Sequence, residues 1–309
     1  MRAVVQYGSG GPEVLKVEDR PEPTRNPGEV LIRTEAIAVP FYETQLRSGL
    51  LPAGQPSIFG HEAAGIVLDA DDPSLRGKRV VTMSYTGGAY AEVVAASEYT
   101  LVPDGLTSAQ AVAAAVPASV ALALIETADV EAGETVLVEA ASGAIGGHLA
   151  RLAGRRGARV VTTAGNEQAD VDHRDPDWRQ KVPDGIDVVF ESIGGPRAGE
   201  LTAKLAPHAR ILAYGMLSGE FPVFPVAGLL ARGITLIGFG GPDAYGKRVA
   251  AARAEALGLV ADGTLIPVID RTYPLAEVAA AHARVESREG AGKVLLSPAL
   301  RPSTPAPAA

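Results

Sequence analysis

The pattern of hydrophobic and polar positions changes twice along the chain. Up to about residue 115, short runs rich in β-branched residues alternate with polar positions and are separated by Gly/Pro turns. Alternation with a period of two is typical of half-buried β-strands. We therefore expect an irregular strand-rich region, with strands at residues 2–6, 14–18, 29–38, 64–68, 79–83 and 90–94.

From residue 117 to residue 243, helix-like stretches alternate with short apolar runs at residues 136–138, 159–163, 187–191, 210–215 and 234–239. Such alternation predicts a parallel sheet. The last part of the chain predicts a long helix from residue 244, a short strand at 266–269, a helix at 275–286 and a strand at 293–296. This order predicts two domains: residues 1–116 with 244–309, and residues 117–243 inserted between them.

A glycine turn links two of the apolar runs. After the run at 136–138 the chain continues Ala140-Ala-Ser-Gly143-Ala-Ile-Gly146, then a helix, then the run at 159–163. A tight turn needs glycine for geometry alone, but a strand, a glycine turn, a helix and a second strand form the mononucleotide-binding unit. The helix offers unpaired N–H groups and its positive dipole end to a pyrophosphate. The turn therefore predicts dinucleotide binding.

Composition narrows the class of protein. The 309 residues are 47% hydrophobic and carry a net charge of −8, which disfavours nucleic acid and anionic membranes as partners. The absence of cysteine excludes disulfides and thiolate metal sites. The alanine-rich stretch 109–125, interrupted by Pro117, predicts a buried helix pair rather than a membrane span. No export signal opens the chain, so we expect a cytoplasmic protein with a loose tail at 301–309.

Several motifs in order resemble one family, the zinc-independent branch of the medium-chain dehydrogenase/reductase superfamily, and within it the quinone-oxidoreductase-like proteins. Besides the glycine turn, the motifs are Phe41-Tyr-Glu-Thr, Arg47-Ser-Gly-Leu, Phe59-Gly-His-Glu-Ala-Ala-Gly-Ile-Val, Gly88-Ala-Tyr-Ala-Glu, Asp187-Val-Val-Phe-Glu-Ser-Ile-Gly-Gly, Tyr273-Pro-Leu and Gly292-Lys-Val.

The resemblance implies an α/β protein with a GroES-like β domain plus a Rossmann domain that has a doubly wound parallel sheet. It implies hydride transfer from a nicotinamide cofactor to a small-molecule substrate, either a quinone or the β carbon of an α,β-unsaturated carbonyl, in an interdomain cleft. It also implies a homodimer in which residues 234–239 of two copies pair. Pairing would remove the hazard of an exposed apolar edge strand.

His61 occupies a position at which zinc-dependent relatives carry a metal ligand. A catalytic zinc site needs further ligands, and the resemblance places cysteines there. This chain has none, and its other histidines lie in later parts of the sequence, at His148, His173, His208 and His282. We therefore expect no zinc, with His61 lining the substrate cleft and Glu62 as its buried partner or the partner of a backbone turn.

The substrate side of the expected cleft departs from the family pattern. Relatives usually carry asparagine at the position of Pro40 and often tyrosine at that of Gln45. Proline has no polar side-chain atom, so one polar contact is lost. Phe41 joins Pro40 in the cleft, and the side chains left to hold the acceptor carbonyl or to supply a proton through water are Tyr42, Gln45 and Tyr85. A packing role is the alternative for each.

The choice of cofactor depends on the residues that come directly after the run at 159–163. An NAD site would place an acidic residue at the position of Ala164, whereas Glu167 lies three residues later and keeps NADH as an alternative. NADPH is favoured because hydroxyl, amide and cationic groups suit a 2′-phosphate. The expected cofactor contacts are Gly143, Ala144, Ile145, Gly146, Thr163, Gly165, Asn166, His173, Arg174, Gly215, Phe239 and Lys293.

A second function stays open. Residues 165–187 form a short, loop-like segment where relatives carry a longer helix, and Ala169 replaces a lysine found in many of them. Together with Pro40, these departures favour a protein that keeps the fold but uses a cofactor weakly or not at all, and that binds or cyclises a small molecule in the cleft.

Overall fold

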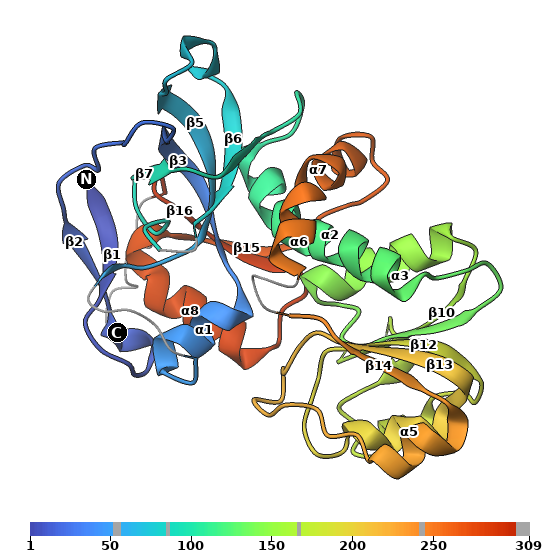
Figure 1. Cartoon of the computed structure of the whole chain (residues 1–309). Coiled ribbons are helices and arrows are strands. Elements are labelled where there is room, and N and C mark those ends of the chain that lie inside the picture. Colours follow the sequence, from blue (N-terminus) through green and yellow to red (C-terminus); the bar gives the residue numbers. More distant parts are fainter. Residues whose placement is uncertain (52–56, 85–86, 166–167, 241–244, 301–309) are drawn as a thin grey trace. The chain divides into compact units, whose positions relative to one another are not determined.

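A computed structural model describes residues 1–51, 57–84, 87–165, 168–240 and 245–300. The contacts divide the chain into two compact units (Figure 1). Unit 1 comprises Met1–Val116 and Leu257–Ala309, and unit 2 comprises Pro117–Ala256. The second boundary lies within helix α7 (Arg253–Ala261), so the contacts group residues 245–256 with unit 2, whereas the sequence suggested residues 244–309 for the other domain.

Unit 1 contains two sheets built from the strand-rich region and the last strands of the chain. The larger sheet has the order β15 (Ile269–Pro274), β16 (Lys293–Ser297), β3 (Val30–Val39), β5 (Glu62–Asp69), β6 (Arg79–Met83) and β8 (Tyr99–Leu101), and β7 (Val93–Ala96) also pairs with β3. The smaller sheet has the order β2 (Leu15–Asp19), β1 (Arg2–Gln6) and β4 (Ser57–Ile58). The helical elements are α1 (Phe41–Ser48), α8 (Val278–Ser287), η1 (Pro12–Val14), η2 (Pro73–Leu75) and η5 (Leu275–Glu277).

The register of the larger sheet brings three chain segments together at one end. Val39, the last residue of β3, pairs with Val294 in β16, while Ile37 pairs with Ala63 in β5. Helix α1 begins directly after β3, with Pro40 in an extended conformation at its N-cap. The start of α1, the start of β5 and the start of β16 are therefore neighbours.

Unit 2 contains a six-stranded parallel sheet. Its order is β11 (Val171–Asp172), β10 (Arg159–Ala164), β9 (Thr135–Val138), β12 (Ile186–Glu191), β13 (Leu205–Ala213) and β14 (Thr235–Gly238). The named helices that lie wholly within it are α3 (Ala144–Arg155), α4 (Trp178–Lys181), η3 (Ala198–Lys204), α5 (Val226–Arg232) and α6 (Lys247–Ala251). Figure 1 shows α3 and α5 on opposite faces of this sheet. The strand order reverses between β9 and β12, so the expected α/β class and doubly wound parallel sheet are confirmed.

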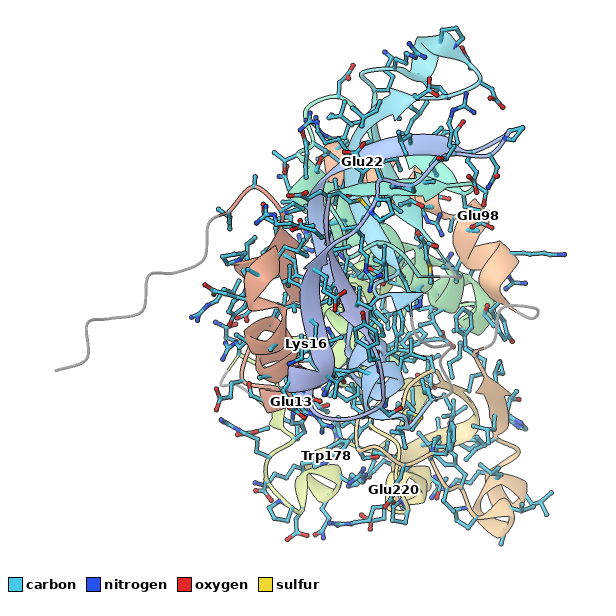
Figure 2. The ribbon with its side chains drawn as sticks, turned by 90° about the vertical axis from the view of Figure 1, so that its left-hand side faces the viewer. Glu13, Lys16, Glu22, Glu98, Trp178 and Glu220 are labelled. Carbon is cyan, nitrogen blue, oxygen red and sulfur yellow. The ribbon has the colours of Figure 1, made fainter. Side chains whose placement is uncertain are left out.

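The core of unit 2 explains why the short segment after β10 stays folded. Trp178, the only tryptophan of the chain and labelled in Figure 2, is 3% exposed. It packs with Val171, Val182 and Leu205 in one hydrophobic cluster. Between β10 and β12 the described part of this segment contains the two-residue strand β11 and the four-residue helix α4, and Trp178 of α4 packs against Val171 of β11.

Helix α2 (Ser108–Ala128) carries the chain from unit 1 into unit 2. It runs without interruption for 21 residues although Pro117 lies inside it. The expected helix pair is therefore wrong, because a single proline removes one backbone donor while the remaining hydrogen bonds of the helix persist. Among the described residues α2 alone is long and apolar enough to span a membrane, and 78% of its most apolar window is buried inside the protein.

Two expectations for the last part of the chain also need correction. The strand expected at residues 266–269 begins only at Ile269, since Pro267 cannot donate a hydrogen bond to a neighbouring strand. The long helix expected from residue 244 is two helices, α6 and α7, in the described residues, and Ala244 itself lies outside them.

Candidate functional site

The glycine turn of unit 2 joins β9 to α3 in the expected way. Gly143 is the N-cap of α3 and Ala140 has a positive φ of 51°. A Cβ atom at Gly146 would lie 2.5 Å from the carbonyl oxygen of Ala140, so only glycine lets the first turn of the helix pack against the loop. The amides of Ala144, Ile145 and Gly146 belong to the first helical turn, where N–H groups have no partner within the helix. This arrangement can hold a phosphate anion.

Thr163 accepts two hydrogen bonds from the backbone of this turn. Its carbonyl oxygen accepts a hydrogen bond from Ala141 N at 2.8 Å, and its hydroxyl oxygen accepts one from Ala140 N at 3.4 Å. The side chain is fully buried. The structure therefore places Thr163 behind the glycine turn, and its expected contact with a cofactor stays a prediction.

Three of the residues expected around a 2′-phosphate lie together beyond β10. A Cβ atom at Gly165 would stand 3.1 Å from His173 Nε2 and 3.5 Å from Arg174 Cδ. Arg174 also binds Asp172 through both carboxylate oxygens, with a shortest distance of 2.7 Å, and these hydrogen bonds lower the pKa of Asp172 to about 2. The guanidinium thus has an anionic neighbour already. Asn166, like Glu167, lies outside the described residues.

Two further expected cofactor residues lie at the ends of β13 and β14. A Cβ atom at Gly215 would be 2.7 Å from Ser192 O, so the second residue after β13 lies against the first residue after β12. Phe239 is 7% exposed and stacks on Tyr245, with ring centroids 4.1 Å apart. Gly215 therefore follows β13, the strand next to β12, and its expected contact with a cofactor stays a prediction.

Unit 1 carries a second polar cluster, centred on Glu43 of α1. The Glu43 carboxylate is fully buried and accepts hydrogen bonds from His61 N at 2.7 Å, from His61 Nδ1 at 2.9 Å and from Tyr90 Oη. The bond from Nδ1 assigns the imidazole the tautomer that leaves Nε2 with a lone pair. The side chain of His61 is 17% exposed, so this is a carboxylate–imidazole pair with access to solvent.

Burial keeps the other groups of this cluster in their neutral forms. Desolvation lowers the pKa of His282 to about 3 and raises the pKa of Tyr90 well above its ordinary value. Tyr90 Oη lies 3.1 Å from His282 Nε2 and donates to Glu43. Desolvation also raises the pKa of Glu43, but its three donors favour the charged form. The cluster therefore holds the His61 ring in place through its contacts with Glu43.

Glu62 has other partners than the sequence suggested. His61 pairs with Glu43, whereas Glu62 forms an ion pair with Lys293 Nζ at 3.1 Å and accepts from Tyr42 Oη at 3.4 Å. The expected pairing of Glu62 with His61 is therefore wrong, because the turn before β5 directs the two side chains to different neighbours. Lys293, expected as a cofactor contact, is 6% exposed and has an internal partner.

The remaining substrate-side residues lie on α1. Pro40 is the N-cap, Phe41 lies under the guanidinium of Arg288 at 5.2 Å, and Gln45 is 6% exposed. The Nε2 atom of Gln45 has no hydrogen-bond partner among the described residues. Tyr85, the third expected donor, lies outside the described residues.

Three acidic residues at these sites were not predicted from the sequence. Glu43 is one, and the others are Glu139 and Glu191, which are fully buried beside the glycine turn. A signal existed for the latter two, since an acidic residue ends each of two apolar strand runs. No group of three or more His, Cys, Asp or Glu side chains that could hold a metal ion occurs in the described parts of the chain.

Two known domain families match the sequence. Residues 26–107 match the family described as alcohol dehydrogenase GroES-like domain, and residues 165–296 match the family described as zinc-binding dehydrogenase. The quinone oxidoreductase of Homo sapiens is 31% identical over 96% of this chain and 97% of its own length. The quinone oxidoreductase of Pseudomonas aeruginosa is 30% identical over 95% of this chain and 99% of its own length.

Solved structures agree with these matches. A mycobacterial protein in complex with NADPH is 29% identical, with a TM-score of 0.86 over 96% of this chain and all of its own. The Escherichia coli quinone oxidoreductase, also in complex with NADPH, has a TM-score of 0.88 over 96% of this chain and all of its own. At 24% identity the latter supports the fold alone.

Proposed function

The chain belongs to the medium-chain dehydrogenase/reductase family and is an oxidoreductase, and on this premise we propose that it uses NADPH to reduce a quinone or the C=C bond of an α,β-unsaturated carbonyl compound. The family resemblance and the GroES-like domain expected from the sequence are confirmed. The observation that carries the proposal is the glycine turn, whose helix N-terminus suits a pyrophosphate.

Two further features support NADPH over NADH. Ala164 ends β10 where an NAD site would carry a carboxylate for the ribose hydroxyl. Gly165, His173 and Arg174 lie together just beyond it, and a mycobacterial relative was solved with NADPH. A 2′-phosphate would compete with Asp172 for Arg174.

The side chains of unit 1 suit the proton half of the reaction. NADPH supplies a hydride to the electron-poor carbon, and the substrate then needs a proton on its oxygen or its α carbon. We propose that His61 first takes a proton from solvent on Nε2 and then delivers it to the substrate, which returns the ring to the tautomer with a lone pair on Nε2. Glu43 holds the ring through Nδ1 in both forms. Tyr42 is the other candidate donor, although its hydroxyl already contacts Glu62.

We also propose that the reaction needs no metal ion. One matching family is described as zinc-binding, but thiolate ligands are excluded because the chain has no cysteine. Without a Lewis acid the acceptor must already be electron-poor, so saturated ketones and simple alcohols should not react. The expected acceptors are therefore conjugated.

The first experiment is titration of NADPH against the purified protein, followed by NADPH consumption with quinones, enones and simple alcohols. We expect tight binding and turnover with conjugated acceptors only. Turnover of alcohols with NAD⁺ would refute the proposal. Absence of NADPH binding would favour the alternative, a protein that binds or cyclises a small molecule without redox chemistry. The pairing of Arg174 with Asp172 and the short segment after β10 are the observations that keep this alternative open.

We further propose that two copies associate through β14. This strand is the last of its sheet and presents an edge, and Leu236 on it is 42% exposed. Nearby positions on α5 and before it are also apolar and exposed, with exposed fractions of 67% for Val226, 76% for Leu230 and 72% for Phe221. An exposed apolar edge invites pairing with a second copy.

Light scattering tests this assembly. The wild type should have twice the mass of the chain at micromolar concentration, and Leu230→Glu should shift it toward the monomer by placing a charge in the apolar surface. A monomeric wild type would contradict the proposal.

A further inference from the structure

Two buried glutamates face each other at the point where the strand order of unit 2 reverses. Glu139 directly follows β9 and Glu191 is the last residue of β12, and the two strands are hydrogen-bonded neighbours, with Val138 opposite Phe190. Both side chains are fully buried. Glu139 also immediately precedes the glycine turn.

In each of the two carboxyl groups one oxygen accepts hydrogen bonds from backbone amides and the other oxygen does not. Glu139 Oε2 accepts from Ser192 N at 2.9 Å and Ile193 N at 3.1 Å, and Glu191 Oε1 accepts from Gly194 N. The second oxygens, Glu139 Oε1 and Glu191 Oε2, have no donor among the described residues. A proton held between these two oxygens would satisfy both.

The charges around the pair lead to the same conclusion. Two ionised carboxylates that are buried in contact repel each other strongly, so one of them retains a proton. Arg179, 7% exposed, is the cation that acts on both carboxyl groups, and it also interacts with Glu200 and Arg197 at the surface. Tyr214 is the remaining titratable neighbour, and burial keeps it protonated by raising its pKa. One proton and one guanidinium make the buried group electrically neutral.

The proton has a preferred site. Glu139 accepts two amide hydrogens, which favours its charged form, whereas Glu191 accepts one. Burial, followed by the charge of Glu139, raises the pKa of Glu191 to about 8. Glu191 therefore carries the proton at neutral pH and donates it to Glu139.

We propose that Glu139 and Glu191 are positioning residues that share one proton, and that this pair holds residues 192–194 in the conformation needed for the dinucleotide. The segment packs beside the turn, since Ser192 Oγ lies 3.5 Å from Glu139 O and Gly215 closes on Ser192 O. Open α/β sheets bind their ligands where the strand order reverses. Loss of the proton leaves two repelling carboxylates under this segment. The inference rests on the proposed NADPH site.

The sign of the effect on stability follows from proton binding. A carboxyl whose pKa is raised on folding contributes stability that is fully present below its ordinary pKa, near 4.5, and is lost as the pH rises through the folded pKa of about 8. The NADPH phosphate loses its second proton near pH 6, so it does not titrate above pH 7. A change between pH 7 and pH 9 therefore reports on the protein.

The decisive variant is Glu191→Gln. Its amide keeps one acceptor for Gly194 N and donates permanently to Glu139 Oε1, which imitates the protonated pair. For the wild type we expect the Kd of NADPH to rise about fivefold or more from pH 7 to pH 9, a change of about 1 kcal/mol. In Glu191→Gln the Kd should stay constant within about twofold. Glu131→Gln, an exposed change in the same unit, should behave as the wild type.

Unfolding of the cofactor-free protein between pH 5 and pH 9 separates this inference from the proposed function. The free energy of unfolding of the wild type should fall as the pH rises across this range. Its slope against pH should be steeper than that of Glu191→Gln by the equivalent of one proton. Equal pH dependence in both proteins would overturn the shared proton, whatever NADPH does. If Glu191→Gln does not fold, Glu139→Gln serves in the same test, because its amide can donate to Glu191. Absence of NADPH binding at every pH would refute the proposed function and the positioning role, while a shared proton would still appear in unfolding.

Discussion

Buried carboxylates have different environments in the two units. Glu43 in unit 1 accepts from three donors, which favour its charged form, and it orients His61. Glu139 and Glu191 in unit 2 have fewer donors each and face one another. Burial alone raises the pKa of every one of these groups. More donors favour the charged form of a buried glutamate, whereas a second carboxyl group in contact favours the protonated form.

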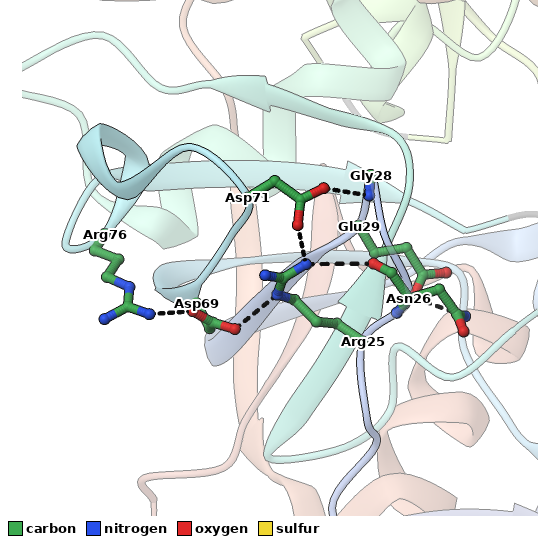
Figure 3. Close-up of polar contacts among 7 residues, drawn as sticks. All are labelled: Arg25, Asn26, Gly28, Glu29, Asp69, Asp71 and Arg76. Carbon is green, nitrogen blue, oxygen red and sulfur yellow. Dashed lines mark hydrogen bonds and ion pairs between the residues drawn. The ribbon is translucent and has the colours of Figure 1, made fainter.

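In contrast to these buried carboxylates, Asp69 and Asp71 of unit 1 form ion pairs at the protein surface. Arg25 binds Asp69 at 2.7 Å and Asp71 at 2.5 Å, and Asp71 also accepts from Gly28 N at 2.6 Å (Figure 3). Hydrogen bonds from Arg25 and Arg76 lower the pKa of Asp69, and those from Gly28 and Arg25 lower the pKa of Asp71. Water already solvates these carboxylates, so pairing costs little and contributes little.

In the proposed function unit 1 supplies the proton and unit 2 binds the cofactor, and His61→Asn should show the largest effect of this division. The asparagine amide can still donate to Glu43, but no acid remains at the position of Nε2. We expect kcat for enone reduction to fall about 100-fold with an unchanged Kd for NADPH. His208→Asn, at an exposed histidine with a positive φ that asparagine tolerates, is the control. Unchanged kcat in a folded His61→Asn would exclude the role.

Ala144→Asp tests the other half of the division. An acidic residue at the first position of α3 favours the helix but repels a pyrophosphate, so the Kd of NADPH should rise at least about tenfold, or 1.4 kcal/mol, without loss of stability. Ala144→Asn has the same shape without the charge and should change the Kd much less. Equal effects of both substitutions would mean that steric contact, not charge, decides.

Glu43→Gln tests whether the orientation of His61 by Glu43 matters for proton transfer. The amide cannot accept from all three donors, so His61 loses its fixed tautomer, and we expect kcat to fall about tenfold and the free energy of unfolding by about 1–3 kcal/mol. Chemical denaturation and kcat are measured on the same preparation. A loss of stability without a loss of kcat would show that Glu43 serves the fold alone.

Arg25→Gln should have the smallest effect. We expect the melting temperature at pH 7 and low salt to change by about 2 °C or less, and the difference to shrink in high salt. Because the pKa values of Asp69 and Asp71 are lowered, their contribution exists above the ordinary carboxyl pKa and is lost as the pH falls through the lowered values. A large change at pH 7 would contradict the contrast with the buried groups.

Local patterns along the chain were sufficient to predict strands that bury one face and the glycine turn between a strand and a helix. Residues 79–83 form β6 with the expected bounds, and the glycine turn lies between the expected strand and helix. Periodicity could not place the strand near residue 266, since Pro267 disrupts pairing there. It could not reveal the continuity of α2 either, since tertiary packing overrides the penalty of one proline.

The sequence by itself determined the family, the α/β class and the glycine turn, because each depends on neighbours in the chain or on motifs in order. Only the tertiary structure decided the partners of the buried polar groups. His61 meets a glutamate 18 residues away, and Tyr90 meets a glutamate 47 residues away. Glu139 and Glu191 become neighbours because β9 and β12 pair at the centre of a parallel sheet. Charge and pKa depend on these distant contacts and on burial, neither of which a local pattern contains.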